Sequence, residues 1–170
     1  MLTAFTIQIA NTELAFRDIG GLQTARLNIR GRLTTIADQR LGIFEEVLTT
    51  SATNDELIHA KDQRSAYSKA FILEPGHYRL DLIARDVVSG GTGIRNVGFQ
   101  VPVYAADKLA TSSLILAAKL EDMKHRSAGD QFVIGANKVI PNLSGSFRRG
   151  QALGVYMQVY NAGTDQTTLR

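Results

Sequence analysis

Residues 73–82 have the sequence LEPGHYRLDL, and this stretch decides the fold that the sequence predicts. Pro75 fixes φ for the second position of a turn, and Gly76 can supply the positive φ of the third position in a type II turn. From Tyr78 onward, apolar side chains come at every second residue, which is the period of a strand with one buried face. A tyrosine near the start of such a strand often donates its hydroxyl to the backbone at the corner of an immunoglobulin-like sandwich. The stretch therefore predicts an all-β sandwich of that type.

The same two-residue period recurs along the first hundred residues. In residues 25–33, Ala, Leu and Ile alternate with Arg and Asn, so one face is predicted to lie in the core and the other in solvent. Further strands are predicted over 5–9, 14–18, 40–50, 65–73, 77–85 and 94–101, with a short helix near 55–62. Pro102 ends the last strand because proline cannot donate to a ladder. The sequence thus predicts an immunoglobulin/fibronectin-III-like β-sandwich over residues 1–103.

Residues 104–170 show weaker strand patterns than the first part of the chain. The candidates are 109–117, 132–134, 139–140 and 153–160. A segment of this size with so few strands is marginal for an independent core. We therefore expect a partial second β-sandwich or a strand-donating extension, completed by further chain or by a partner strand.

Composition and charge exclude several classes of protein. The chain has 170 residues, a net charge of +3 and no cysteine, which excludes disulfides, thiolate nucleophiles and Cys-ligated zinc. So small a basic surplus argues against nucleic acid as a partner. The longest apolar stretch, 109–120, is interrupted by polar residues and falls short of the ~20 residues of a spanning helix. The first residues lack a basic segment and a cleavage site, so we expect any secretory signal to lie upstream of residue 1.

No group of residues in the sequence predicts a reaction. The three histidines, His59, His77 and His125, have no second ligand at metal-binding spacing. The glycine-rich stretch 89–93 lacks the spacing of a phosphate-binding loop and is predicted to be a hairpin loop. Asp81 and Asp86 are expected on opposite faces of one strand, so they do not form a catalytic pair. We therefore expect no catalytic residue, no cofactor, no metal and no enzymatic activity.

Two surfaces are candidates for interaction. The first is the outward face of the strand at 25–33, where Arg26, Arg30 and Arg32 can dock an acidic partner or a polysaccharide. The alternative is a solvated face whose aliphatic stems cover the sheet. The second surface is the strand predicted at 153–160, whose candidate contact residues are Leu153, Val155, Tyr156, Met157 and Tyr160. Its two tyrosines form either an exposed aromatic patch or a face buried against further strands.

Six blocks of sequence, taken in order, resemble the C-terminal region of large envelope proteins found mainly in acidobacteria. These are the GWxTD-domain proteins and the related von Willebrand factor A-like proteins. The blocks are 73–82, 85–90, 101–104, 109–117, 132–141 and 155–161. The resemblance implies a periplasmic or surface-exposed protein whose signal peptide and defining domain lie upstream, and it implies no activity. The Gly-Trp-x-Thr-Asp signature itself is absent, since the chain has no tryptophan, so no family site residue is carried over.

The sequence as a whole favours a non-enzymatic structural or interaction module of a bacterial cell-envelope or extracellular assembly. Its partners are expected to be other proteins or further copies of itself, bound through strand edges and sheet faces. We expect no nucleic acid and no membrane-spanning segment, with membrane association only through an upstream region or through partners. The alternative is a carbohydrate- or ligand-binding β-sandwich that uses the loop at 89–93 and the arginine face.

Overall fold

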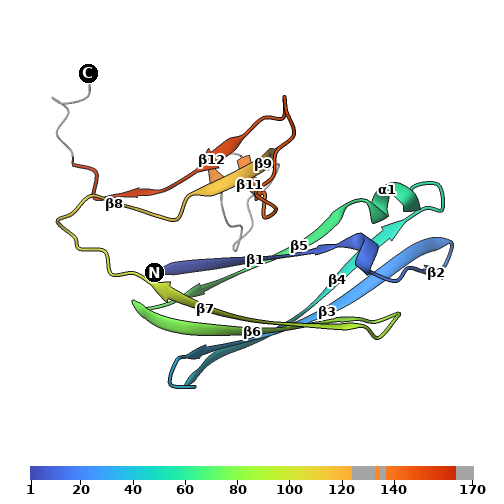
Figure 1. The fold of residues 1–170 in the computed structure, drawn as a ribbon, viewed down its shortest axis with the longest axis horizontal. Coiled ribbons are helices and arrows are strands. Elements are labelled where there is room, and N and C mark those ends of the chain that lie inside the picture. The colour runs from blue at the N-terminus through green and yellow to red at the C-terminus, as the bar shows by residue number, and fades with distance from the viewer. Residues whose placement is uncertain (124–132, 135–136, 164–170) are drawn as a thin grey trace. The chain divides into compact units, whose positions relative to one another are not determined.

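The computed structural model describes residues 1–123, 133–134 and 137–163, and shows an almost entirely β protein (Figure 1). The chain divides into two compact units, Met1–Pro102 and Val103–Arg170. The predicted all-β class is confirmed, as is the short helix, α1, at Leu57–Lys61.

The first unit is built from two antiparallel sheets. Its elements are β1 (Leu2–Ala10), a 3-10 helix (Asn11–Glu13), β2 (Arg17–Ile19), β3 (Leu22–Thr35), β4 (Arg40–Ala52), α1, β5 (Arg64–Ile72), β6 (Gly76–Asp86) and β7 (Thr92–Val101). The larger sheet has the order β4-β3-β6-β7, with the short β2 pairing the start of β3. Within the described residues, the smaller sheet contains β1 and β5 alone. Residues 14–18 were predicted as one strand, but only Arg17–Ile19 pairs, since the 3-10 helix ends at Glu13 and Leu14 turns into the core.

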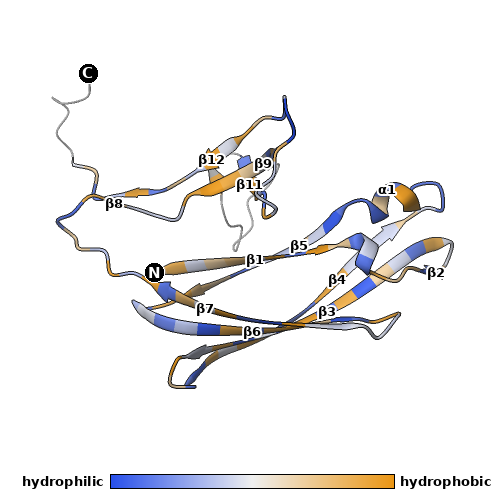
Figure 2. Cartoon of the chain, in the orientation of Figure 1, coloured by the Kyte–Doolittle hydropathy of each residue, from blue (hydrophilic) through white to orange (hydrophobic). Residues whose placement is uncertain are grey.

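The core lies between these two sheets. Along β3 the buried residues Ala25, Leu27, Ile29 and Leu33 alternate with exposed polar ones, as predicted, and Figure 2 shows this alternation of hydropathy. From the smaller sheet, Phe5 packs edge-on against Phe99 of β7, with ring centroids 4.8 Å apart. Phe71 of β5 lies against Phe44 of β4 with the two rings tilted and their centroids 5.9 Å apart. Thus β1 covers the β7 side of the larger sheet and β5 covers the β4 side, which makes the unit a β-sandwich.

The corner before β6 forms as predicted in one respect and differs in another. Tyr78 is buried and its hydroxyl donates to the backbone oxygen of Glu74 at 2.6 Å, as expected. The predicted positive φ at Gly76 was wrong, because Gly76 is the first residue of β6 and is not among the positive-φ glycines. Its lack of a side chain serves another purpose. A Cβ at this position would lie 3.2 Å from the Tyr78 hydroxyl, so glycine makes room for the tyrosine.

The strands of the second unit differ in number and bounds from those that the sequence predicted. They are β8 (Ala110–Thr111), β9 (Ile115–Asp122), β10 (Val133–Ile134), β11 (Asn137–Pro141), β12 (Gly154–Tyr156) and β13 (Val159–Tyr160). One sheet has the order β10-β11-β9-β12, and β13 pairs β8 separately. The strand predicted at 109–117 is two strands, broken at residues 112–114. Of the strand predicted at 132–134, Phe132 lies outside the described residues.

The continuous strand predicted over 153–160 was also wrong. Val155 of β12 pairs with Leu116 of β9, whereas Val159 of β13 pairs with Thr111 of β8. Between the two, Gln158 and Ser112 exchange hydrogen bonds: the Ser112 N–H donates to the Gln158 oxygen at 2.8 Å, and the Gln158 N–H donates to the Ser112 hydroxyl oxygen. The segment therefore changes partner halfway, which the unbroken alternation of its side chains does not reveal.

Candidate functional site

The arginine face lies on the outside of the larger sheet, where the sequence placed it. Arg30 forms an ion pair with Glu45 of β4 at 3.2 Å, and Arg32 forms one with Asp81 of β6 at 2.9 Å. Arg26 is exposed and has no ion pair with any residue that the structure describes. The face is therefore not a continuous cationic stripe, because neighbouring carboxylates neutralise two of the three arginines.

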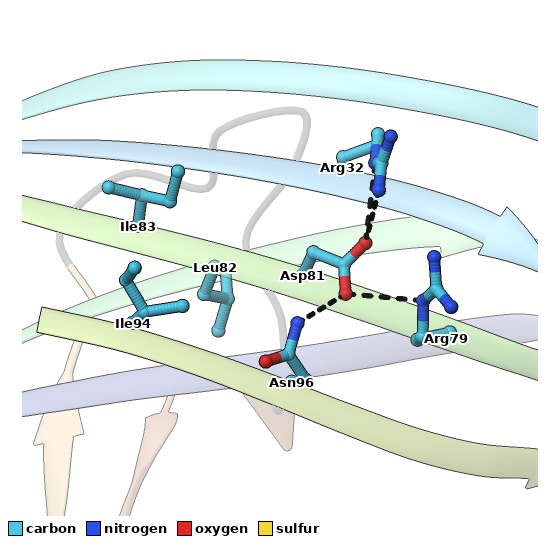
Figure 3. Close-up of a pocket in the computed structure, with 7 residues that line it drawn as sticks. All are labelled: Arg32, Arg79, Asp81, Leu82, Ile83, Ile94 and Asn96. Atoms are coloured by element: carbon cyan, nitrogen blue, oxygen red, sulfur yellow. Dashed lines mark hydrogen bonds and ion pairs between the residues drawn. The ribbon is translucent and has the colours of Figure 1, made fainter.

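Asp81 is the centre of a polar cluster on this face (Figure 3). One carboxylate oxygen accepts from Arg32, and the other accepts from the Asn96 amide at 2.6 Å and lies 3.2 Å from Arg79 Nε. Arg79 also pairs with Asp38 at 2.8 Å. The hydrogen bonds from Arg32 and Asn96, together with the Arg79 charge, hold the pKa of the Asp81 carboxyl below its usual value. The carboxylate thus joins β3, β6 and β7, and its oxygens are already occupied.

A shallow depression lies beside this cluster. Apolar side chains of Ile83 and Ile94 line it together with the polar groups around Asp81. The depression thus combines apolar surface with charged groups that are paired with one another.

Asp86, at the end of β6, is buried on the opposite face from Asp81, as predicted. Its carboxylate accepts from the Ala15 N–H at 2.7 Å, the Val88 N–H at 2.9 Å and the Ser89 hydroxyl at 2.8 Å. Burial opposes ionisation, but these donors outweigh it and hold the pKa of Asp86 below its usual value. Asp86 therefore ties the segment after the 3-10 helix to the β6–β7 turn, which is a structural role.

The predicted hairpin between β6 and β7 is confirmed, but its turn is at residues 87–91, so that Thr92 and Gly93 of the predicted loop already belong to β7. The Gly90 N–H donates to the backbone carbonyl oxygen of Asp86, the Gly91 N–H donates to the Ser89 hydroxyl oxygen, and Gly90 takes a positive φ of 75°. These loop donors are used within the turn, so they are not presented to a ligand.

The histidines lie apart from one another. His59 is near the end of α1 and its Nε2 lies 2.9 Å from the Gln63 amide, while His77 is exposed on β6. His125 lies outside the described residues. Within the described parts of the chain, no group of three or more His, Cys, Asp or Glu side chains is placed to hold a metal ion.

The residues singled out between 153 and 160 divide between two environments. Leu153, Val155 and Met157 are exposed, with 56% of Val155 accessible. Tyr156 and Tyr160 are only partly exposed. The Tyr160 ring lies 5.1 Å from that of Tyr104, and burial raises the pKa of the Tyr160 hydroxyl. The exposed part of this surface is therefore aliphatic, and the tyrosines belong to the packed part.

The open edge of β1 is a surface that the sequence analysis missed. In the described part of the chain, β1 pairs with β5 alone, so its other edge carries unpaired backbone groups. None of its nine residues, LTAFTIQIA, is charged. The lack of charged residues was visible in the sequence. It could not be linked to an open edge until the structure showed that β1 is an edge strand.

In the described residues, no helix is long and apolar enough to span a membrane. Comparison of the chain with protein-family models, with curated proteins and with solved structures finds no match.

Proposed function

We propose that this chain is a non-enzymatic interaction module that binds other proteins through strand edges and sheet faces. The observation that carries the proposal is the smaller sheet, in which β1 and β5 have no further strand beside them among the residues that the structure describes. An unpaired edge presents a row of N–H and C=O groups that another strand can bind. The polar clusters at Asp81 and Asp86 support the same proposal. The oxygens of both carboxylates accept hydrogen bonds from neighbouring residues of the chain, so neither carboxylate is available as an acid or base.

The module is proposed to be an immunoglobulin-like sandwich. Support comes from the Tyr78 hydroxyl bonded back to Glu74 at the start of β6, which is typical of a tyrosine corner. The order β4-β3-β6-β7, opposed by β1-β5, corresponds to such a sandwich without its outer strands in the smaller sheet. The resemblance of its six sequence blocks to envelope proteins is the basis for placing the module in a bacterial periplasmic or surface assembly.

Cross-linking in the native cell tests this function. A tagged copy of the chain should cross-link reproducibly to one or a few defined proteins, and the cross-linked peptides should map to its strand edges or exposed sheet faces. A chain that is recovered alone, with no repeated cross-linked partner after isolation from its own envelope fraction, would contradict the proposal.

Carbohydrate binding is the second candidate function. It is favoured by the depression beside Asp81, where guanidinium, carboxylate and amide groups meet the apolar surface of Ile83 and Ile94. A glycan array tests it, with a variant in which Arg26, Arg30 and Arg32 are replaced by alanine as the control. Binding that the triple variant loses would favour this candidate, and an array without any bound glycan would reject it.

A further inference from the structure

We propose that the open edge of β1 is a strand-acceptor site, which takes an extended segment of a partner protein as a third strand of the smaller sheet. This inference rests on the proposed interaction function and names its site and the chemistry of its partner. We expect this partner segment to carry apolar or uncharged side chains at every second position. It also carries an acidic side chain that faces Arg95.

The hydrogen-bond register identifies the backbone groups that are free to bind. Met1 and Leu73 exchange both of their backbone hydrogen bonds, and the Asn11 N–H donates to Gln63 at the far end of the ladder. In an antiparallel pair such bonded positions recur at every second residue. The odd-numbered residues of β1 therefore bond β5, whereas the N–H and C=O groups of the even-numbered residues point away from it. These free positions are Leu2, Ala4, Thr6, Gln8 and Ala10.

The composition of β1 differs from that of the other edges of this unit. Edge strands in soluble proteins are usually protected by charged residues, proline or bulges. The other edge strands all contain charged residues. These are Arg40, Glu45 and Glu46 in β4, Arg64 and Lys69 in β5, and Arg95 in β7. Only β1, among these four, has neither charge, proline nor glycine. An unprotected edge of this kind is expected where another strand covers it in the assembled state.

The larger sheet leaves apolar surface uncovered on the β1 side. Phe99 of β7 is covered by Phe5, but Val97, two residues along on the same inward face, is 43% exposed. Arg95 follows on that face opposite Leu82, and it is exposed too. A strand added beside β1 would lie over this part of β7, because β1 itself covers the β7 side of the sandwich. The open edge and the uncovered face therefore indicate one and the same missing strand.

Charge favours a foreign segment over a second copy of this chain. Arg95 has no ion pair with a described residue, so a carboxylate on the added strand would find an unpaired guanidinium. In a symmetric dimer through β1, the strand added over this patch would be β1 of the other copy, which carries no carboxylate. Arg95 would then lack a counter-charge, whereas an acidic segment supplies one.

The sheet supplies a matched pair of variants for the test. Ala4 and Ala70 lie directly opposite each other at a position that carries no ladder bond between β1 and β5. Ala4→Pro removes an N–H from the open edge of β1, and Ala70→Pro removes one from the outer edge of β5, with no β1–β5 bond lost in either. Thr6→Lys and Ser68→Lys form a second pair, because each loses the same 3.0 Å hydrogen bond and adds one charge to one of the two edges.

The probe is a phage-displayed library of random peptides, about ten residues long so that each can span β1. Selection on the full chain should enrich sequences with alternating apolar residues and an acidic residue. Ala4→Pro and Thr6→Lys should weaken these peptides about tenfold or more, whereas Ala70→Pro and Ser68→Lys should leave their affinity unchanged. On binding of an enriched peptide, amide exchange should slow at Ala4, Thr6 and Gln8, and this readout on the unmodified chain does not depend on how any variant folds.

Several results would overturn the inference. The selection could enrich no peptides. Enriched peptides could bind the β1 variants as tightly as the unmodified chain, or the β5 variants could weaken them as much as the β1 variants do. Self-association of the free chain that Ala4→Pro abolishes would show that the occupant is a second copy. If native cross-linking finds a partner while β1 stays unprotected from exchange, the site is wrong and the interaction function stands. If no partner is found either, both fail.

Discussion

At the scale of single residues, Gly31 of β3 packs closely against the ring of Phe44 of β4. The two are directly opposite, and a Cβ added to Gly31 would lie 2.2 Å from the Phe44 ring. We expect Gly31→Ala to lower the free energy of unfolding by about 1–3 kcal/mol, because the ring must move within a packed core. Gly98→Ala is the control, since nothing lies within 4 Å of its added Cβ. Urea unfolding measures both, and equal stability of the two variants would contradict this packing.

Asp86 makes a second prediction at this scale. Its pKa is lowered in the folded state, so its contribution to stability is complete above the ordinary carboxyl pKa of about 3.9 and is lost as the pH falls through the lower folded value. Asp86→Asn should cost about 1–3 kcal/mol at neutral pH, since an amide cannot accept from all of the carboxylate's donors. The difference in free energy of unfolding between variant and wild type should disappear as the pH falls below about 4. Urea midpoints across pH measure this difference, with the exposed Asp55→Asn as control, and a difference independent of pH would refute the assignment.

At the scale of elements, substitutions on the exposed face of β12 should affect stability differently from substitutions on its packed face. Val155 is exposed, whereas Gly154 lies against Ala117, so that an added Cβ would be 3.0 Å from the Ala117 Cβ. We expect Val155→Thr to change stability by less than about 0.5 kcal/mol, and Gly154→Ala to cost more. Thermal unfolding of the two variants measures this difference. A Val155→Thr variant that unfolds much earlier than wild type would show that this face is covered.

The accuracy of sequence-based prediction follows the length of the elements. The alternation in β3 and β6 extends over enough residues to identify their buried faces, including Tyr78 and Leu80. In the second unit, β8, β10 and β13 have two residues each, so alternation could not locate their ends. The role of Gly76 was also missed, because the close approach of the Tyr78 hydroxyl is a tertiary contact. The open edge of β1 was missed for the same reason, since pairing is a property of the sheet.

At the scale of the whole molecule, the first unit holds its own core. Both clusters of buried residues lie entirely between Met1 and Val101. We therefore expect a fragment of residues 1–102 to fold alone and to unfold in a single cooperative transition, with a midpoint close to that of the first unit in the full chain. Denaturant unfolding followed by tyrosine fluorescence and circular dichroism measures it. A fragment without a cooperative transition would show that the second unit is needed for folding.

The central claim is that β1 is an open edge in the free chain and a paired strand in its assembly. Residue-resolved amide hydrogen exchange tests this most directly. In the free chain, the amides of Ala4, Thr6 and Gln8 should exchange fast and those of Phe5 and Ile7 slowly, because only the odd positions bond β5. In the native assembly, all five should exchange slowly. An alternation that persists unchanged in the assembly, or that is absent from the free chain, would contradict the account.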